Sequence, residues 1–295
     1  NTRSDPISGT RQGTLEIRNG SADLKPETSK NTFAGIVFTP TENITLTADW
    51  WHIKQKDVVG ILSSQTQILY DAILRADGGS NQNVIRNDND EILYVTNDYT
   101  NLLPREIKGV DYSISYKLDT DIGKFTFSAN AAHLTKFEQG LDSITQSVTD
   151  AQAAGDPAVL YNGDAVGIPG AAGDLLAKNG RPEWRSNLGI KWKNGSWGAG
   201  VKYKYTSELE NIFLSYFDEN DDLIYHQIDS WATVDAYATY SFAKQNNWLD
   251  KTKVTLGARN IGDEEPPFSS NTFGYENSVH SSSGRYLYMT LNKKF

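Results

Sequence analysis

The sequence predicts an all-β fold, an antiparallel transmembrane β-barrel, and three observations support this prediction. Apolar and polar residues alternate along several segments, as in strands with two unlike faces. Short and long connections between these segments alternate strictly. The mean hydropathy is -0.52, and the 295 residues contain no apolar run of about 18 residues, which excludes a helical membrane protein. The same polarity is normal in a barrel, where only every second strand residue meets lipid.

The composition excludes several classes of function. The chain has no Cys, so it contains neither a disulfide framework nor a Cys-based metal site. The net charge of -9 argues against nucleic acid as a partner. No phosphate-binding or dinucleotide-binding motif occurs, and the His residues lack a metal-ligand spacing: His52, His133, His226 and His280. We therefore expect no enzyme activity, no cofactor and no metal site.

The beginning of the chain predicts a loop followed by a hairpin. Residues 1–31 are rich in Ser, Thr, Asn and Gly without sustained alternation, so we expect a loop. The polar opening carries no signal peptide, which indicates a fragment or a mature product. A short apolar strand over 32–38, a tight turn over 39–43 and an alternating strand over 44–59 form the hairpin.

The first long insert, residues 62–101, predicts a helix and a small hairpin. Apolar residues recur at helical spacing over 68–76, and two Gly residues at 78–79 follow as a stop signal. The Asn-Asp-Asn-Asp segment at 87–90 predicts a hairpin tip between two short apolar runs. The alternative is an oxygen-rich calcium loop. The segment lacks the Gly and the terminal Glu of an EF-hand loop, which favours the hairpin.

The middle of the chain predicts two hairpins separated by a second long insert over 135–180. The Asn-Gly pair at 194–195 is a two-residue hairpin signal. The predicted strands cover residues 109–118, 125–131, 181–193 and 197–205.

The last part contains two more long inserts and three strands. The insert over 206–230 is acidic and aromatic, and strands over 233–242 and 254–259 follow it. An insert over 262–283 precedes the terminal strand, 284–295. Four apolar residues of that strand share one face, interrupted only by Lys293, and we expect them to act as a barrel-assembly signal: Leu287, Met289, Leu291 and Phe295.

The connections are sorted by length, which is typical of outer-membrane barrels. Turns near residues 40, 121, 195 and 247 are short, whereas inserts near 80, 158, 218 and 273 are long. Outer-membrane barrels have short periplasmic turns and long extracellular loops, whereas a soluble sandwich has no reason to sort its loops by length.

Charged residues in the middle of the strands fall on the polar face, which predicts a water-filled lumen. The lumen-facing candidates are Asp111, Lys117, Arg185, Lys191, Lys202, Lys204, Asp235 and Arg259. Aromatic residues at strand ends fit interfacial belts, such as Trp192, Trp197 and Tyr205.

The strand count indicates an incomplete barrel. We expect about nine strands, each near the ~9–11 residues that a tilted membrane strand needs. Bacterial single-chain barrels have even strand numbers. We therefore expect that the chain begins at an outer loop, partway around a larger barrel.

Four segments resemble motifs of the TonB-dependent receptors, and in their order they span the whole chain. Residues 22–29 (ADLKPETS) look like N-P-x-L-K-P-E-T-S, 43–57 like L-S-L-S-x-D-Y-W, 260–268 (NIGDEEPPF) like N-L-F-D-x-x-P-P, and 284–295 like the closing G-R…F strand. Ala22 departs from the pattern, because the family often has Pro there. The resemblance implies that this chain is the C-terminal part of a 22-stranded barrel, with the plug domain and the TonB box upstream of Asn1.

The resemblance also implies a function. Such a receptor lies in the outer membrane of a Gram-negative cell, binds a scarce extracellular solute such as a siderophore or an oligosaccharide, and imports it with energy from TonB. The expected partners are TonB, outer-membrane lipid, the outer-membrane assembly machinery and the solute. The acidic, aromatic loops favour neutral ligands such as sugars or peptides over anionic catecholate siderophores. The candidate loop contacts are Phe213, Tyr216, Phe217 and Tyr225.

Three other interpretations remain open at this point. A passive porin needs an unobstructed lumen, so the sequence upstream of Asn1 would distinguish a porin from a receptor with a plug domain. A barrel without transport function, such as an adhesin or assembly platform, would not cause a growth defect on one nutrient when deleted. A soluble all-β binding domain would be a stable monomer without detergent.

Overall fold

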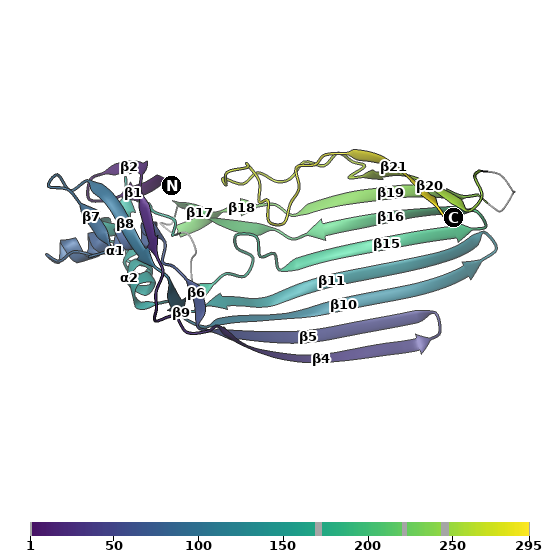
Figure 1. Ribbon diagram of the computed structural model, residues 1–295, viewed down its shortest axis with the longest axis horizontal. Helices are drawn as coiled ribbons and strands as arrows, with labels where there is room; N and C mark the ends of the chain where they lie inside the picture. The colour runs from purple at the N-terminus through teal and green to yellow at the C-terminus, as the bar shows by residue number, and fades with distance from the viewer. Residues whose placement is uncertain (1, 169–172, 220–222, 243–247, 295) are drawn as a thin grey trace.

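The computed structural model describes residues 2–168, 173–219, 223–242 and 248–294, and its main element is one large antiparallel sheet. Nine long strands follow one another in space in sequence order (Figure 1). They are β4 (Thr28–Thr41), β5 (Ile44–Lys56), β10 (Arg105–Thr120), β11 (Gly123–Gln139), β15 (Trp184–Asn194), β16 (Trp197–Thr206), β19 (Trp231–Ser241), β20 (Thr252–Arg259) and β21 (Tyr286–Lys293). The predicted all-β fold and strand number are confirmed. Within the described residues β4 and β21 form the two edges, and the sheet does not close.

The connections between these strands are sorted between the two ends of the sheet, as predicted. The short connections at 42–43, 121–122 and 195–196 lie at one end, and the long inserts gather at the other (Figure 1). The connection between β19 and β20, near residue 247, includes 243–247, which lie outside the described residues. The short-turn end therefore corresponds to the periplasmic side and the long-loop end to the extracellular side.

The register separates polar and apolar residues onto opposite faces, because directly opposite residues of an antiparallel pair share a face. One row across six strands is polar: Thr47, Ser113, Asn130, Asn187, Lys204 and Thr233. The adjacent row is apolar: Leu46, Ile114, Ala129, Leu188, Tyr203 and Val234. Ile114 is 47% and Leu188 48% exposed, which fits a face that meets lipid rather than water.

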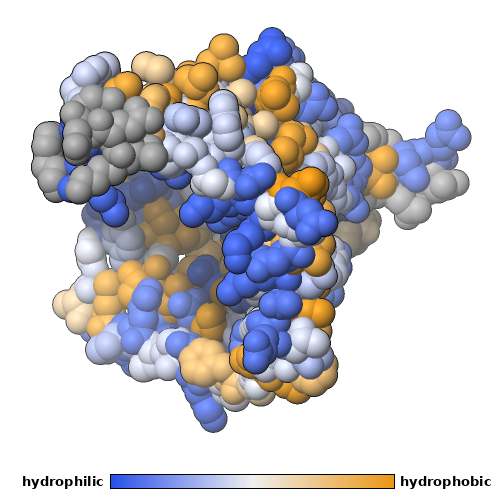
Figure 2. Space-filling view, turned by 90° about the vertical axis from the view of Figure 1, so that its right-hand side faces the viewer, coloured by the Kyte–Doolittle hydropathy of each residue, from blue (hydrophilic) through white to orange (hydrophobic). Residues whose placement is uncertain are grey.

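The sheet is curved, with the polar face inward. Seen from the short-turn end, the molecule is hollowed on one side (Figure 2). The apolar residues of β21 continue the outward face: Leu287 and Met289 are 71% and 72% exposed and pair with Ala258 and Leu256. This confirms the predicted face of the terminal strand, whereas Phe295 lies outside the described residues. None of the described helices is long and apolar enough to cross a membrane.

Aromatic side chains form two belts on the outward face. Near the long-loop end, Trp184 stacks on His133 at 3.9 Å and on Tyr112 at 6.4 Å between ring centroids. Near the short-turn end, the Trp192 ring N–H donates to a backbone carbonyl, and Trp197 packs edge-on against a Tyr ring. Trp184 and Trp192 lie eight residues apart on β15, about 26 Å along the strand at about 3.3 Å per residue. At a strand tilt of about 35–45° this length corresponds to a height of about 20 Å, which spans most of the apolar band of an outer-membrane barrel, about 25 Å tall.

The first outer insert forms the predicted helix and hairpin. Helix α1 (Ser64–Ala76) begins after Ser63, whose hydroxyl accepts from the Thr66 N–H and caps the helix. Strands β7 (Val84–Arg86) and β8 (Ile92–Asp98) pair around the tip at 87–90, so the hairpin interpretation is confirmed. The Asn87 side chain accepts from the Asn89 and Glu91 N–H groups, which stabilises the turn. Among the described residues no group of three or more His, Asp or Glu could hold a metal ion.

The prediction of a loop over 1–31 is wrong in part. This segment forms β1 (Thr2–Asp5), β2 (Thr10–Gly13) and β3 (Glu16–Asn19) before β4 begins at Thr28. Strand β3 pairs in parallel with β8, joining Glu16 to Val95. Such pairing depends on a distant partner rather than on local alternation, which explains why the sequence pattern did not indicate it.

The other outer inserts are also structured. Strand β11 continues to Gln139, beyond the predicted start of the insert at 135. Helix α2 (Ser143–Ala153) packs on α1 through the fully buried side chains of Val148 and Leu69, and the buried Val159, just after α2, joins the same cluster. The remaining elements are β6 (Val58–Gly60), β9 (Thr100–Leu102), η1 (Pro157–Val159), β12 (Leu160–Tyr161), β13 (Asp164–Ala165), β14 (Gly173–Asp174), β17 (Leu209–Phe217) and β18 (Leu223–Ile228). Strands β17 and β18 form a hairpin within the insert over 206–230.

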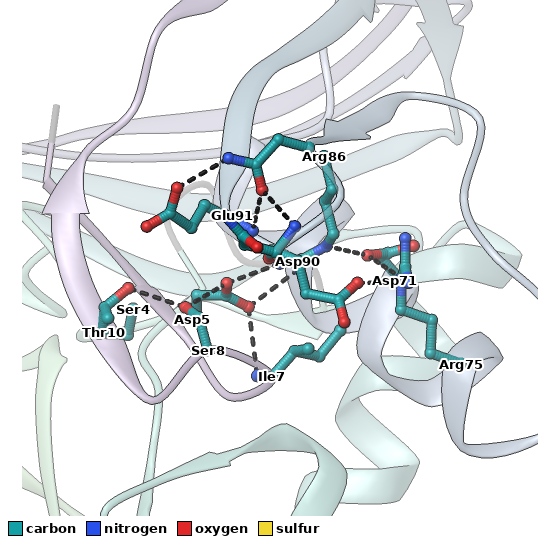
Figure 3. A network of polar contacts seen from close by, with 12 residues as sticks. Ser4, Asp5, Ile7, Ser8, Thr10, Asp71, Arg75, Arg86, Asp90 and Glu91 are labelled. Atoms are coloured by element: carbon teal, nitrogen blue, oxygen red, sulfur yellow. Dashed lines mark hydrogen bonds and ion pairs between the residues drawn. The ribbon is translucent and has the colours of Figure 1, made fainter.

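A buried ion cluster joins the beginning of the chain to the first outer insert (Figure 3). The Arg86 guanidinium donates to both carboxylate oxygens of Asp5, at 2.7 and 2.9 Å, and to Asp71 at 2.8 Å. The side chains of Asp5 and Asp71 are fully buried, and that of Arg86 is 2% exposed. Burial opposes ionisation of Asp5, but hydrogen bonds from Arg86 and Ser8 outweigh it, so the pKa of Asp5 lies below its usual value.

Candidate functional site

All eight predicted lumen residues lie on the inward face. Asp111 and Arg185 share one row, and Lys204 belongs to the next. Lys202 and Asp235 are directly opposite each other, and Lys117, Thr126 and Lys191 form a row nearer the short turns. Arg259 pairs with Tyr286 at the outer ends of β20 and β21. Five of the eight residues line two pockets on this face.

The first pocket, of about 390 Å³, contains Lys204, Asp235 and Arg259. The Lys204 ammonium lies 2.6 Å from an Asp235 carboxylate oxygen. Asp235 also accepts from the backbone N–H of Asn260 at 3.0 Å. Because the cation and the carboxylate compensate each other, this part of the pocket is polar without a large excess of charge.

Aromatic rings and the last outer insert complete the first pocket. The Arg259 guanidinium lies over the rings of Tyr286 and Tyr288, 6.0 and 5.8 Å from their centroids. The Trp231 ring N–H donates to the Glu265 carbonyl at 3.0 Å. Two hydroxyl groups of the last insert, at 281 and 283, also line the pocket. A solute in this pocket would meet ring faces, hydroxyl groups and an ion pair.

The turn after β20 explains how the last insert is positioned. The Asn260 side-chain amide donates to the Glu264 carbonyl, and its oxygen accepts from the Glu264 N–H, both at 2.9 Å. Asn260 itself has a φ of 47°, a conformation that Asn tolerates better than most residues. This Asn belongs to the 260–268 motif, so the motif has a structural role at the edge of the pocket.

The second pocket, of about 380 Å³, lies on the same face across β5, β10, β11 and β15. It contains Asp111 and Arg185, and Asp49 lies directly opposite Asp111. Two amide side chains, Asn130 and Asn187, line its floor. The remaining three predicted residues share the face but line neither pocket: Lys117, Lys191 and Lys202.

The predicted loop contacts lie on the β17–β18 hairpin. The backbones of Phe213, Tyr216 and Phe217 belong to β17, and their side chains lie outside the described residues. Tyr225 on β18 is partly buried, and burial together with the nearby Glu210 carboxylate raises its pKa. The role of these four residues in ligand binding stays a prediction.

One residue beside the first pocket, His280, was not among the predicted site residues. Its side chain is buried, at 6% exposure, and its ring centroid lies 5.4 Å from that of Trp231. Neither ring nitrogen has a hydrogen-bond partner in the described part of the chain. Burial lowers the pKa of His280, which favours the neutral ring. A lone His in a polar insert carries no pattern that could have identified it.

A sequence model described as "TonB dependent receptor-like, beta-barrel" matches residues 3–261, most of the chain. The chain belongs to the TonB-dependent receptor family. The resemblance inferred from the four motifs is thereby confirmed, and so is the location in the outer membrane, where the receptors of this family lie. No curated protein matches the chain in a sequence comparison.

Solved structures of TonB-dependent receptors share the fold. The siderophore receptor PirA from Acinetobacter baumannii aligns with a TM-score of 0.54 and 15% identity, covering 93% of this chain and 32% of PirA. A mutant of the ferric enterobactin receptor PfeA from Pseudomonas aeruginosa, solved in complex with enterobactin, aligns with a TM-score of 0.56 and 14% identity, covering 93% of this chain and 32% of PfeA. The FrpB iron transporter from Neisseria meningitidis aligns with a TM-score of 0.54 and 12% identity, covering 95% of this chain and 33% of FrpB. The chain thus spans about a third of the length of these receptors.

Proposed function

We propose that this chain forms part of the wall of an outer-membrane transport receptor. The receptor binds a scarce extracellular solute beneath its outer loops and imports it with energy supplied through TonB. Its contribution is binding and passage rather than catalysis. The observation that carries the proposal is the inward polar face with the first pocket at its outer end, in a chain of this receptor family.

The position of the first pocket supports uptake from outside the cell. The pocket lies at the outer ends of β20 and β21, and residues of the last outer insert contribute to it. A solute that enters between the loops reaches this pocket before it reaches the inward lysines nearer the short turns. The loops would therefore capture the solute, and the inward face would guide it.

For the ligand class we favour a neutral, hydroxyl-rich solute such as an oligosaccharide, or a short peptide. Ring faces of Trp and Tyr stack on the apolar patches of such ligands, and hydroxyl groups supply hydrogen bonds. The Lys204 ammonium is occupied by Asp235, and the Arg259 guanidinium lies over two Tyr rings. Neither cation is held ready for a strongly anionic ligand. PirA, PfeA and FrpB are described as siderophore or iron receptors, so ferric siderophores are the class to test against.

Uptake of labelled solutes by cells that produce the receptor, with and without TonB, tests this proposal. We expect saturable, TonB-dependent uptake of a neutral oligosaccharide or peptide. Saturable import of a ferric catecholate siderophore would overturn the ligand class. Linear uptake that does not depend on TonB would identify a passive porin, and no uptake of any solute would favour an adhesin or another barrel without transport function.

A further inference from the structure

One part of the inward face carries no charge. Six of the eight predicted lumen residues lie on β10, β15 and β16, and the other two lie near the outer ends of β19 and β20, beside the first pocket. Between Arg259 and Lys253 of β20, the described inward side chains of β19, β20 and β21 are all uncharged. We define this neutral strip as Tyr286, Tyr288 and Thr290 on β21, Gly257 and Thr255 on β20, and Tyr237 and Thr239 on β19.

The register places the neutral strip on the inward face. Tyr237 is four residues from Thr233 on β19, and Thr233 belongs to the inward polar row. Gly257 lies directly opposite Tyr237, and Tyr288 lies directly opposite Gly257, so the three residues share this face. The next row towards the short turns consists of Thr239, Thr255 and Thr290.

Glycine residues allow the tyrosine rings of the strip to lie close to the wall. The end of the Tyr288 ring occupies the space beside Gly257, where an added Cβ would lie 2.5 Å from the Tyr288 Oη. Tyr237 covers Gly200 on β16 in the same way, with its Cε1 2.5 Å from an added Cβ. Both rings therefore lean over the neighbouring strand, and both side chains stay partly exposed. This arrangement leaves room for a solute in front of the wall.

The rings of the strip continue from the first pocket. Tyr286 lines that pocket, and its ring lies 6.4 Å from that of Tyr288 between centroids, with the planes within 17° of each other. Tyr237 is two strands from Tyr288, about 10 Å at about 4.8 Å per strand. Beyond the rings, the side chain of Thr290 is exposed and that of Thr255 is partly exposed. A solute that leaves the pocket along this strip would meet ring faces first and hydroxyl groups next.

The chemistry of the strip fits a chain of sugar rings. Sugar rings have apolar faces that stack on aromatic rings, and their hydroxyl groups exchange hydrogen bonds with Thr hydroxyls. A peptide presents an N–H and a C=O at every residue, which ring faces would leave unsatisfied. An anionic solute would find no cation in the strip, and the Arg259 guanidinium above it already lies over two Tyr rings.

We propose that the neutral strip is the route along which a linear, neutral oligosaccharide passes from the first pocket towards the short turns. Successive sugar rings contact Tyr286, Tyr288 and Tyr237, and the charged strands β10, β15 and β16 take no part in these contacts. The inference rests on the proposed function and narrows its ligand class to a chain of sugars. A single sugar contacts only the pocket, whereas a chain also contacts the rings below it. The receptor should therefore bind a chain more tightly than a single sugar.

The dependence of affinity on chain length tests the proposal. The probes are neutral fragments of glucans, xylans, mannans and chitin with one and six sugar units, titrated calorimetrically into the purified full receptor in detergent. The test variant carries Tyr237→Leu and Tyr288→Leu, which removes two ring faces but keeps apolar side chains over the glycines. A second variant carries Tyr237→Phe and Tyr288→Phe and keeps the rings. The matched control carries Tyr112→Leu and Tyr203→Leu on the outward face. Heat-modifiable mobility in gel electrophoresis verifies that each variant is folded.

In the native receptor we expect six units of one of these sugars to bind at least tenfold more tightly than one unit. The preference should fall at least fivefold in the Leu variant and stay within twofold in the Phe variant and the outward control. If the double Leu variant fails to fold, Tyr288→Leu alone is expected to lower the preference about threefold, because Tyr237 remains.

Three results would overturn the proposal. An unchanged preference in the Leu variant, or an equal fall in the outward control, would exclude the strip as the route and leave the proposed function in place. Equal affinity of the native receptor for one and six units would do the same. If none of the sugars binds at either length, the ligand class in the proposed function is wrong, and this inference is wrong with it.

Discussion

Lys204 on β16 forms its ion pair diagonally, with Asp235 on β19, and not with Thr233, the residue directly opposite it. The residue directly opposite Asp235 is Lys202, which is exposed on the same face. Asp235 also accepts a hydrogen bond from the backbone N–H of Asn260, the residue after β20. Its carboxylate therefore connects β19 to both β16 and β20. The pair therefore shapes the wall of the first pocket, and a second lysine on the same face provides a control.

Replacing Lys204 by Gln should weaken solute binding about tenfold, because the wall of the pocket loses the charge-assisted hydrogen bond between Lys204 and Asp235 that shapes it, and such a bond contributes about 1.5–3 kcal/mol. The variant leaves the Asp235 carboxylate without its cation inside the pocket. Lys202→Gln removes the same charge from the same face, and we expect it to change the affinity less than twofold. Isothermal titration of the purified receptor with the transported solute measures the affinity of each variant. Equal effects of the two variants would show that binding responds to the charge of the lumen and not to this ion pair.

A lysine at position 188 should impair membrane insertion, whereas a lysine at position 187 should not. Leu188 lies midway between Trp184 and Trp192 on the outward face of β15, at the middle of the apolar band. A charged residue at this depth costs about 2–4 kcal/mol. Asn187 is its neighbour on the inward face and meets the wet lumen, so Asn187→Lys tests the same strand without the lipid contact. Urea unfolding of the two variants from lipid vesicles measures the free energy of unfolding of each. A similar loss of stability in both variants would contradict the assignment of the faces.

Gly123→Ala should destabilise the turn between β10 and β11. Gly123 has a φ of +121°, and an added Cβ would lie 2.5 Å from the Lys193 carbonyl oxygen. Holding a residue other than Gly in such a conformation costs about 1–3 kcal/mol. Gly20→Ala is the control, because Gly20 has open space around it and no positive φ. Urea unfolding of both variants checks the difference, and an unchanged midpoint for Gly123→Ala would mean that the turn can relax.

The faces of the wall could be predicted from the sequence because side chains on a strand repeat every two residues. Arg185 and Lys191 were assigned to the polar face in this way, and in the register they are in phase with Asn187 and out of phase with Leu188. The parallel pairing of β3 with β8 could not be predicted, because the two strands lie far apart in the chain. The pocket residues were predicted only as members of a face. Alternation does not distinguish Lys202 from Lys204, since the choice of partner depends on the diagonal geometry between β16 and β19.

The same limit applies to the basic side chains that meet at the outer ends of β5, β10 and β11. Lys54, Lys108 and Lys136 belong to three strands and come together only through the register. Alternation alone would assign Lys108 to the apolar face and treat it as an exception. Its position beyond the aromatic belt explains the exception, because the apolar requirement ends where the hydrocarbon ends.

The buried ion cluster around Arg86 should hold the outer cap of the receptor together. Arg86→Met removes the cation and leaves the carboxylates of Asp5 and Asp71 buried without it, which costs about 3–5 kcal/mol. We expect faster native-state hydrogen exchange of α1 at pH 7. The exposed pair between Asp119 and Lys124 is the control, and Lys124→Met should leave exchange unchanged. Adding Asp5→Asn to Arg86→Met should restore part of the protection, because the carboxylate left without a cation is then gone, whereas Asp71 keeps its ion pair with Arg75.

The same cluster should make the cap sensitive to acid. The folded pKa of Asp5 lies below its ordinary value of 3.8, so its ionised form is favoured by folding. The stabilisation from Asp5 is therefore present above pH 3.8 and is lost as the pH falls below that value and through the folded pKa. Exchange of α1 amides, corrected for the intrinsic rate, should accelerate between pH 4 and pH 2 in the receptor. In the Asp5→Asn variant this acceleration should be smaller, because Asn does not titrate. An acceleration of the same size in both would assign the acid sensitivity to groups other than Asp5.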